Sequence, residues 1–262
     1  MSEALLLLVA ATALVALIMA VVWGIAVHIG NASIVDIAWS WNFTPLALLY
    51  AALSAGWLPR RLLIAALFTL WSARLGAYLH ARVMGHHPEE DGRYQRLRRE
   101  WAPRANLRFF WFFQAQAALN VILSAPLLVA GLNPRSSFHP LETAATALWA
   151  FALLGESVAD RQLDRFRQDP ANRGRTCDLG LWRYSRHPNY FFEWLIWVAY
   201  FLFALASPGG LATVYCPLLM LYFLFRVTGI PMTEAQALKS RGEAYREYQR
   251  KTSAFVPWFK KA

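Results

Sequence analysis

Residues 175–197, RTCDLGLWRYSRHPNYFFEWLIW, run from a basic, polar loop straight into an apolar segment of membrane-spanning character. Within this stretch Arg186, His187 and Pro188 come directly before Asn189 and Glu193, which lie one helical turn apart. Cations, an amide and a carboxylate beside a lipid-buried helix are costly unless they bind something charged. The stretch therefore predicts a membrane protein with a cofactor site at the membrane surface.

The composition agrees with a membrane protein. Hydrophobic residues make up 57% of the 262 residues and charged residues only 16%, which is outside the range of ordinary soluble domains. The net charge of +10 comes mostly from arginines in residues 82–108 and 161–186, and such clusters mark cytoplasmic loops. Contact with anionic lipid headgroups is the alternative explanation of this charge, and we do not expect a nucleic acid partner.

The apolar runs predict an all-α fold, a bundle of seven transmembrane helices with cytoplasmic loops and a C-terminal surface helix after Pro231. With the basic loops inside, the N-terminus lies outside and the C-terminus in the cytoplasm of a bacterial inner membrane. We expect one membrane-embedded domain over residues 1–262 and a short helix after Gly92. The seven predicted spans are residues 4–27, 34–53, 61–81, 108–130, 142–160, 190–207 and 210–229.

Two residues within the predicted spans are candidate acids. Asp36 is a lone carboxylate, and such a group usually faces a cavity or a cation, for which Arg74 is the obvious candidate. The pair could clip two helices together, or Asp36 could donate a hydrogen bond or a proton to a substrate oxygen. Tyr78 could be an interfacial tyrosine or the acid itself.

Other polar residues of the spans have simple structural explanations. Gln114, Gln116 and Asn120 could join helices through hydrogen bonds. In residues 155–169, GESVADRQLDRFRQD, the carboxylates could pair with arginines of the same helix, or they could bind a cofactor's ribose while the arginines bind phosphate.

Sequence motifs of soluble nucleotide-binding and hydrolytic sites are missing. There is no GxGxxG, P-loop, HExxH or GxSxG. The two cysteines, Cys177 and Cys216, show no pattern for zinc or a disulfide framework, so we expect free thiols and no metal. Any nucleotide must be held by membrane helices and loops.

Four stretches resemble the steroid 5α-reductase-like membrane proteins, in particular their bacterial branch: VDIAWSW, LWSARLGAYLHAR, EEDGRYQRLR and GLWRYSRHPNYFFEWLIW. The resemblance covers most of the chain. It implies a seven-helix fold, NADPH bound in a cytoplasm-facing cavity, and hydride delivery to the β-carbon of an enone whose carbonyl an acid polarises.

The resemblance also supplies candidate site residues. Asn189, Glu193 and Trp197 match the family's cofactor residues after a turn that contains a glycine, here Gly180, and Asp36 or Tyr78 is the candidate catalytic acid. The full set predicted to bind the cofactor is Arg93, Tyr94, Asp160, Arg167, Arg175, Arg186, His187, Asn189, Tyr190, Glu193, Trp197 and Arg226.

Three departures from the family leave alternatives open. Asp36 stands where eukaryotic steroid reductases have a Gln-Glu pair, and Glu156 stands where the family has Asn. The tail TEAQALKSRGEAYREYQRKT instead resembles isoprenylcysteine carboxyl methyltransferases, which share RHPxY and use S-adenosylmethionine. The alternatives are therefore such a methyltransferase and a non-enzymatic lipid-binding or structural protein, although the arginine-rich loops favour a cofactor with phosphates.

The predicted substrate is an apolar enone that enters from the lipid. Trp39, Trp41, Trp71 and the phenylalanines of FFWFF, residues 109–113, are the aromatic residues expected to surround it. The choice between NADPH and NADH, the substrate itself and the oligomeric state stay open.

Overall fold

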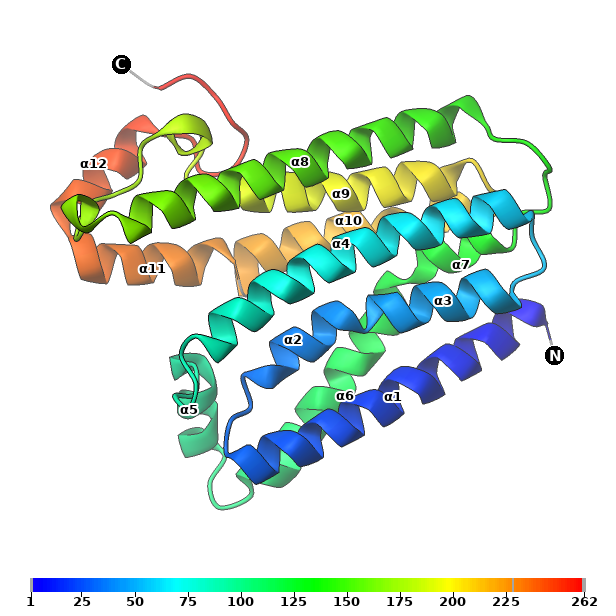
Figure 1. Cartoon of the computed structure of the whole chain (residues 1–262), viewed down its shortest axis with the longest axis horizontal. Helices are drawn as coiled ribbons and strands as arrows, with labels where there is room; N and C mark the ends of the chain where they lie inside the picture. The colour runs from blue at the N-terminus through cyan, green and yellow to red at the C-terminus, as the bar shows by residue number, and fades with distance from the viewer. Residues whose placement is uncertain (1, 228, 261–262) are drawn as a thin grey trace. The chain divides into compact units, whose positions relative to one another are not determined.

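The chain is described by a computed structural model over residues 2–227 and 229–260, and these residues fold into helices joined by short loops with no β-strand among them (Figure 1). The prediction of an all-α fold is confirmed. The chain divides into two compact units. Unit 1 contains the residues up to Phe138 and Ala206–Gly210, and unit 2 contains His139–Leu205 and the residues from Leu211 onward. The prediction of one domain over residues 1–262 stays a prediction.

Unit 1 is built on long apolar helices. In it α1 packs against α6, and α4 packs against α2 and α3. Gly30, with φ of +68°, ends α1 in the left-handed conformation that glycine adopts readily. Its helices are α1 (Glu3–Ile29), α2 (Ile34–Trp41), α3 (Phe43–Leu53), α4 (Leu58–Met84), α5 (Gly92–Glu100), α6 (Ala105–Leu123) and α7 (Ala125–Gly131). The short helix expected after Gly92 is α5.

The predicted span 34–53 is two helices, α2 and α3, rather than one. Pro45 lies in the first turn of α3 and has no backbone N–H, so the carbonyl of Trp41 loses its helical partner and the ladder breaks. Pro126 does the same between α6 and α7 within the predicted span 108–130. These breaks come from single prolines, which a count of apolar residues does not register.

Unit 2 places α8 (Pro140–Gln168) beside α9 (Pro188–Leu205). The two helices approach closely at Gly155, where an added Cβ would lie 2.4 Å from the ring of Phe192. The remaining elements that lie wholly in this unit are η1 (Pro170–Asn172), η2 (Gly180–Arg183), α10 (Tyr215–Tyr222), η4 (Phe223–Val227), α11 (Ile230–Arg241) and α12 (Glu243–Lys251). The single surface helix predicted after Pro231 is therefore two, α11 and α12, separated at Gly242, where φ is +56°.

Five stretches of the described residues are long and apolar enough to cross a membrane, which fits a membrane protein. The predicted count of seven is not reproduced, because residues 34–53 are broken at Pro45 and residues 142–160 lie in α8, which carries acidic residues. The orientation of the termini and the bacterial inner membrane stay predictions. The five stretches are Glu3–Ile29, Leu58–Met84, Ala105–Gly131, Pro188–Leu205 and Gly210–Arg241.

Polar side chains join the helices of unit 1, as predicted for Gln114 and Asn120. Asn120 donates to the carbonyl of Trp39 at 3.0 Å and accepts from Asn42 at 3.0 Å. Gln114 donates to the carbonyl of Ala16 at 3.3 Å. These bonds tie α6 to α1 and to the α2–α3 junction, because a buried amide must find partners.

The aromatic residues expected around a substrate are partly core residues of unit 1. Trp71 is buried and its ring meets that of Phe43 at 5.1 Å between centroids. Trp39 also packs against Phe43, at 5.3 Å, whereas Trp41 is 40% exposed. Trp71 therefore contributes to packing whatever else it does.

Candidate functional site

Asp36, in the first turn of α2, is the centre of a charged cluster in unit 1. The Arg93 guanidinium lies 2.6 Å from Asp36 Oδ2, and the Tyr94 hydroxyl donates to Oδ1 at 2.6 Å. Arg82, near the end of α4, lies 3.7 Å from Oδ2. The Arg93 guanidinium also stacks over the Tyr94 ring at 4.5 Å. The structure therefore brings three predicted site residues, Asp36, Arg93 and Tyr94, into direct contact.

The ion pairs found at Asp36 come from Arg93 and Arg82, and the predicted pair with Arg74 stays a prediction. Arg74 lies eight residues before Arg82 on the same helix, about 12 Å away along the axis at 1.5 Å per residue. The Arg74 guanidinium lies 6.0 Å from the ring centroid of Tyr78. Tyr78, the second candidate acid, is half-buried on α4.

The loop before α5 brings Arg93 and Tyr94 to Asp36. The backbone N–H of Asp91 donates to Ser33 Oγ at 2.9 Å, and the backbone N–H of Ala32 donates to Glu90 Oε1 at 2.7 Å. Glu90 also accepts two hydrogen bonds from Arg98, at 2.7 and 2.9 Å. The loop is thus fixed to the α1–α2 junction through several independent contacts.

The charges of this cluster support one protonation state. Burial and the neighbouring Asp36 carboxylate raise the pKa of Tyr94 well above its usual range, so the phenol is a neutral donor. Burial lowers the pKa of Arg93, but the charges of Asp36, Tyr94 and Asp91 outweigh that effect and the pKa is raised. In both contacts Asp36 is the hydrogen-bond acceptor.

In unit 2, four predicted cofactor residues meet where α8 and α9 pack. The Asn189 amide donates to Asp160 Oδ1 at 3.0 Å, and its own oxygen accepts from the backbone N–H of Tyr190. The Trp197 indole donates to Glu193 Oε1 at 2.9 Å. Asp160, Glu193 and Trp197 are buried. One of these bonds joins α8 to α9 across 29 positions of the sequence, and the other lies within α9.

The glycine-containing turn before α9 is fixed to α8. Gly180 has φ of +55°, and an added Cβ would lie 2.4 Å from the Gln162 amide. The backbone N–H of Leu181 donates to Gln162 Oε1 at 2.8 Å, and the Trp182 indole donates to the carbonyl of Ala159 at 2.8 Å. Glycine is required here by both conformation and space.

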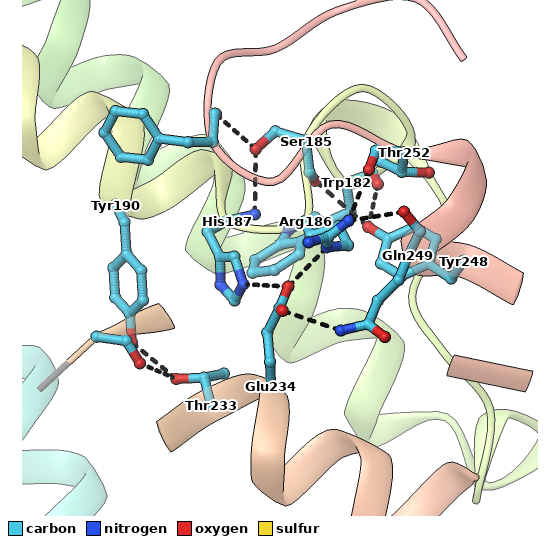
Figure 2. A network of polar contacts seen from close by, with 12 residues as sticks. Trp182, Ser185, Arg186, His187, Tyr190, Thr233, Glu234, Tyr248, Gln249 and Thr252 are labelled. Atoms are coloured by element: carbon cyan, nitrogen blue, oxygen red, sulfur yellow. Dashed lines mark hydrogen bonds and ion pairs between the residues drawn. The ribbon is translucent and has the colours of Figure 1, made fainter. Parts of the chain in front are cut away.

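Arg186 and His187 belong to a network centred on Glu234 of α11 (Figure 2). Arg186 Nε donates to Glu234 Oε1 at 2.6 Å, and His187 Nε2 lies 3.2 Å from the same oxygen. Arg186 Nη1 donates to the carbonyls of Gln249 and Thr252 at 2.8 and 2.9 Å. Much of the guanidinium predicted to bind phosphate is therefore bonded to the C-terminal segment.

Main-chain contacts extend this attachment along the C-terminal segment. The backbone N–H of Arg186 donates to the carbonyl of Ser253 at 2.9 Å, and the backbone N–H of Trp258 donates to the carbonyl of Tyr184 at 2.9 Å. Ser185 Oγ donates to the carbonyl of Phe255 at 2.7 Å. Residues 253–258 therefore lie along the loop that precedes α9.

Tyr190 joins the same network. Its ring stacks on His187 with centroids 5.4 Å apart and an interplanar angle of 6°, and its hydroxyl lies 3.2 Å from Thr233 Oγ1. Sequence reasoning missed Glu234, Gln249 and Thr252 as members of this site. The available signal was the polar segment after Pro231, whose resemblance to a methyltransferase tail had already set it apart.

The arginines of residues 161–175 are not paired with the acid expected to hold them. Within the described residues, no ion pair joins Asp164 to Arg161, Arg165 or Arg167. Arg167 and Arg175 are exposed. Arg226, in η4, is also exposed. Intrahelical ion pairing therefore does not explain the charge of this segment.

No metal site is found in the part of the chain that the structure describes: residues 2–227 and 229–260 contain no group of three His, Cys, Asp or Glu side chains suited to an ion. Cys177 and Cys216 are free thiols, as predicted, and both are buried. Burial raises the pKa of Cys177, so its thiol is protonated at neutral pH.

Comparison with known proteins identifies relatives over most of the chain. The family described as "Protein of unknown function (DUF1295)" matches residues 22–252. A protein of Schizosaccharomyces pombe, described as "Uncharacterized protein C594.04c", is 32% identical over 265 residues, which covers 90% of this chain and 76% of that protein. No solved structure matches.

Proposed function

The chain belongs to the DUF1295 family, and we propose that it is an NADPH-dependent membrane reductase that adds hydride to the C=C bond of an enone in an apolar, steroid-like substrate. Four stretches that resemble steroid 5α-reductases motivate the proposal. Cofactor binding is assigned to residues of unit 2 and carbonyl polarisation to a residue of unit 1. Each assignment has a test of its own.

One observation carries the proposal. Unpaired arginines of residues 161–175 directly follow, in the sequence, the Asp160 carboxylate that holds Asn189. Arginine forks suit phosphate groups, and a carboxylate with an amide suits ribose hydroxyls or a carboxamide. This donor set fits a dinucleotide with several phosphates better than S-adenosylmethionine, which has none.

In unit 2 we assign phosphate binding to Arg167 and Arg175. Asn189 and Glu193 orient the carboxamide, and Trp197 holds the Glu193 carboxylate in place through its indole N–H. Bound NADPH would supply the hydride from its nicotinamide ring. The remaining contribution of the protein is to bind, to orient and to exclude water.

In unit 1 we assign carbonyl polarisation to Tyr78. Both carboxylate oxygens of Asp36 already accept hydrogen bonds, one from Arg93 and one from Tyr94, so Asp36 is engaged within its own cluster. The Tyr78 hydroxyl can donate to the oxygen on which charge develops, and one donor of this kind contributes about 3 kcal/mol in a dry site. The engagement of Asp36 by Arg93 and Tyr94 is the reason for assigning the acid role to Tyr78 in this proposal.

The first experiment is thermal unfolding of the detergent-purified protein with NADPH, NADH and S-adenosylmethionine. A ligand at 100 times its dissociation constant stabilises the folded state by about 2.7 kcal/mol. We expect a rise in the unfolding temperature with NADPH. If S-adenosylmethionine alone raises it, the hydride mechanism is abandoned.

Matched variants sharpen this experiment. We expect Arg167→Gln with Arg175→Gln to remove the NADPH shift, because both guanidinium groups bind phosphate. The control is Arg246→Gln, which removes an arginine of α12 that pairs with the exposed Glu243. Tyr78→Phe is expected to keep the NADPH shift and to lose turnover of an enone. If the Arg246 variant lost the NADPH-induced rise in unfolding temperature to the same extent, the loss would be explained by the change in net charge alone.

A specific observation favours a second candidate, an S-adenosylmethionine-dependent methyltransferase of the isoprenylcysteine carboxyl methyltransferase type. The RHPNY loop is bound to the tail through Arg186, His187 and Glu234, and these are the two segments that resemble those methyltransferases. The ligand panel above separates the two candidates. A shift with S-adenosylmethionine that Glu234→Gln abolishes would support methyl transfer.

A further inference from the structure

The C-terminal segment presents two aromatic side chains to the outside. Trp258 is 68% exposed and Phe259 is 76% exposed, more than any other large apolar side chain of the described residues. Val256, in the same segment, is 50% exposed, and Leu179, in the loop before α9, is 63% exposed. A cluster of this kind is unusual on a surface that meets only water, and it marks an interaction site.

Trp258 and Phe259 are exposed although the segment that carries them is bonded to the rest of the fold. The backbone N–H of Trp258 donates to the carbonyl of Tyr184, and Lys260 Nζ lies 2.5 Å from Asp178 Oδ2. The Phe259 ring meets the Tyr184 ring edge-on, with 6.2 Å between centroids. The segment is thus held on both sides of its two exposed rings.

The position of this cluster indicates its partner. Tyr184, to which the segment is bonded, lies four residues before Pro188, where the candidate membrane span α9 begins. Four residues reach at most about 14 Å. The polar layer on each side of the hydrocarbon core is about 5–8 Å thick. If α9 spans the membrane, the aromatic cluster is within reach of the headgroup layer.

The chemistry of the cluster matches that layer. Tryptophan and tyrosine are enriched at membrane–water interfaces, where the ring is apolar and the N–H or O–H remains hydrated. Arg183 is exposed beside Tyr184, Lys260 follows the aromatic pair, and Lys261 comes next in the sequence. Cations next to interfacial aromatic rings attract anionic headgroups.

We propose that Val256–Lys260, together with Leu179 and Tyr184, form an interfacial anchor that inserts into the headgroup layer of a membrane containing anionic lipid. The anchor has a consequence for the loop before α9. The segment that carries the aromatic rings also bonds to Ser185 and Arg186, so lipid contact restrains that loop. The anchor itself does not depend on the proposed reductase activity.

The test places one copy of the protein in a lipid nanodisc with a fluorescent probe at residue 259. Phe259→Cys is labelled in a background of Cys177→Ser and Cys216→Ala, and Glu243→Cys on α12 is the matched control because it is also exposed. We expect iodide in the water to quench the probe at 259 several-fold less than at 243. We expect lipids with a spin label near the headgroup to quench the probe at residue 259 more than lipids with a label near the end of the acyl chain.

The lipid composition provides the second arm. Nanodiscs of phosphatidylcholine alone and of phosphatidylcholine with phosphatidylglycerol are compared, and shielding of residue 259 is expected to increase with the anionic lipid. Equal access of iodide to residues 259 and 243 would overturn the proposal. Shielding that appears only when two copies share a disc would assign the cluster to self-association instead.

A second measurement needs no cysteine replacement, so it remains possible if the protein with Cys177→Ser and Cys216→Ala does not fold. Brominated lipids quench tryptophan on contact, and the difference between the native protein and Trp258→Phe isolates the signal of residue 258. We expect lipids brominated near the headgroup to quench a larger fraction of the native fluorescence than of the variant's. An unchanged fraction would contradict the anchor.

Discussion

Asp36 in unit 1 and Glu234 in unit 2 each accept a hydrogen bond at 2.6 Å from an arginine that lies far away in the sequence. The two clusters differ in what else their arginine binds. Among the described residues, the Arg93 guanidinium donates to the side chains of Asp36 and Tyr94, whereas that of Arg186 also binds two main-chain carbonyls of the C-terminal segment. The same ion pair can therefore connect side chains or hold a whole segment of backbone.

The surroundings enlarge that difference. The loop that carries Arg93 is also held by Glu90 and Ser33, so it keeps several contacts if the ion pair is lost. Arg186 is only 11% exposed and Glu234 16%. Loss of Arg186 removes the arginine from Glu234, which keeps its contacts with His187 and Gln249, and it leaves two main-chain carbonyls without that donor. We therefore expect the unit 2 network to be more sensitive than the Asp36 cluster.

The largest effect is expected for Arg186→Met. Removing one member of a largely buried ion pair costs about 3–5 kcal/mol, because the remaining charge loses that partner. Thermal unfolding in detergent measures the loss, and limited proteolysis after Lys251 is expected to become faster as the tail detaches. Arg250→Met on α12 is the control, since its pair with Glu243 is exposed. If both variants lost the same stability and were cleaved at the same rate, the Arg186 network would not be more sensitive than an exposed ion pair.

A smaller effect is expected for Asp36→Asn. The Asp36 side chain is 21% exposed, and loss of its charge weakens the bonds from Arg93 and Tyr94 by about 1–2 kcal/mol. Arg82→Gln is the matched control, because Arg82 is 46% exposed and lies 3.7 Å away, and such pairs contribute about 0.5 kcal/mol. A loss of turnover with unchanged stability would instead place Asp36 in the reaction.

Features of this fold that depend on residues close together in the sequence could be predicted, and those that depend on distant residues could not. Hydropathy identified the long helices, because burial in lipid needs only a run of apolar residues. The break at Pro45 is local and could have been predicted from the proline itself. The division at Gly242 between α11 and α12 is of the same kind.

Within the candidate site, the spacing of residues along one helix could be predicted, whereas most contacts between distant segments were missed. Asn189 and Glu193 lie one turn apart on α9, and their spacing alone marked them. Arg93 and Glu234 reach their partners across 57 and 48 positions, and no local pattern reports such a contact. Arg74 was preferred for Asp36 because both lie in apolar segments, whereas the 2.6 Å ion pair of Asp36 comes from Arg93 in the short helix α5.

The smallest effect concerns pH and tests the protonation state of the Asp36 cluster. The pKa of Tyr94 is raised in the folded protein, so above about pH 10 an unfolded tyrosine loses its proton while the folded one keeps it. The unfolded state then binds fewer protons, and stability falls as pH rises. Tyr94→Phe lacks this contribution but also lacks the hydrogen bond to Asp36, worth about 1 kcal/mol.

The native protein should therefore exceed Tyr94→Phe in unfolding temperature near pH 8, and the difference should shrink above pH 10. Ionisation of the other tyrosines is common to both proteins and cancels in the difference. A difference that stays constant with pH would mean that Tyr94 ionises equally in both states. The Tyr94 phenol would then not be held neutral by burial and by the neighbouring Asp36.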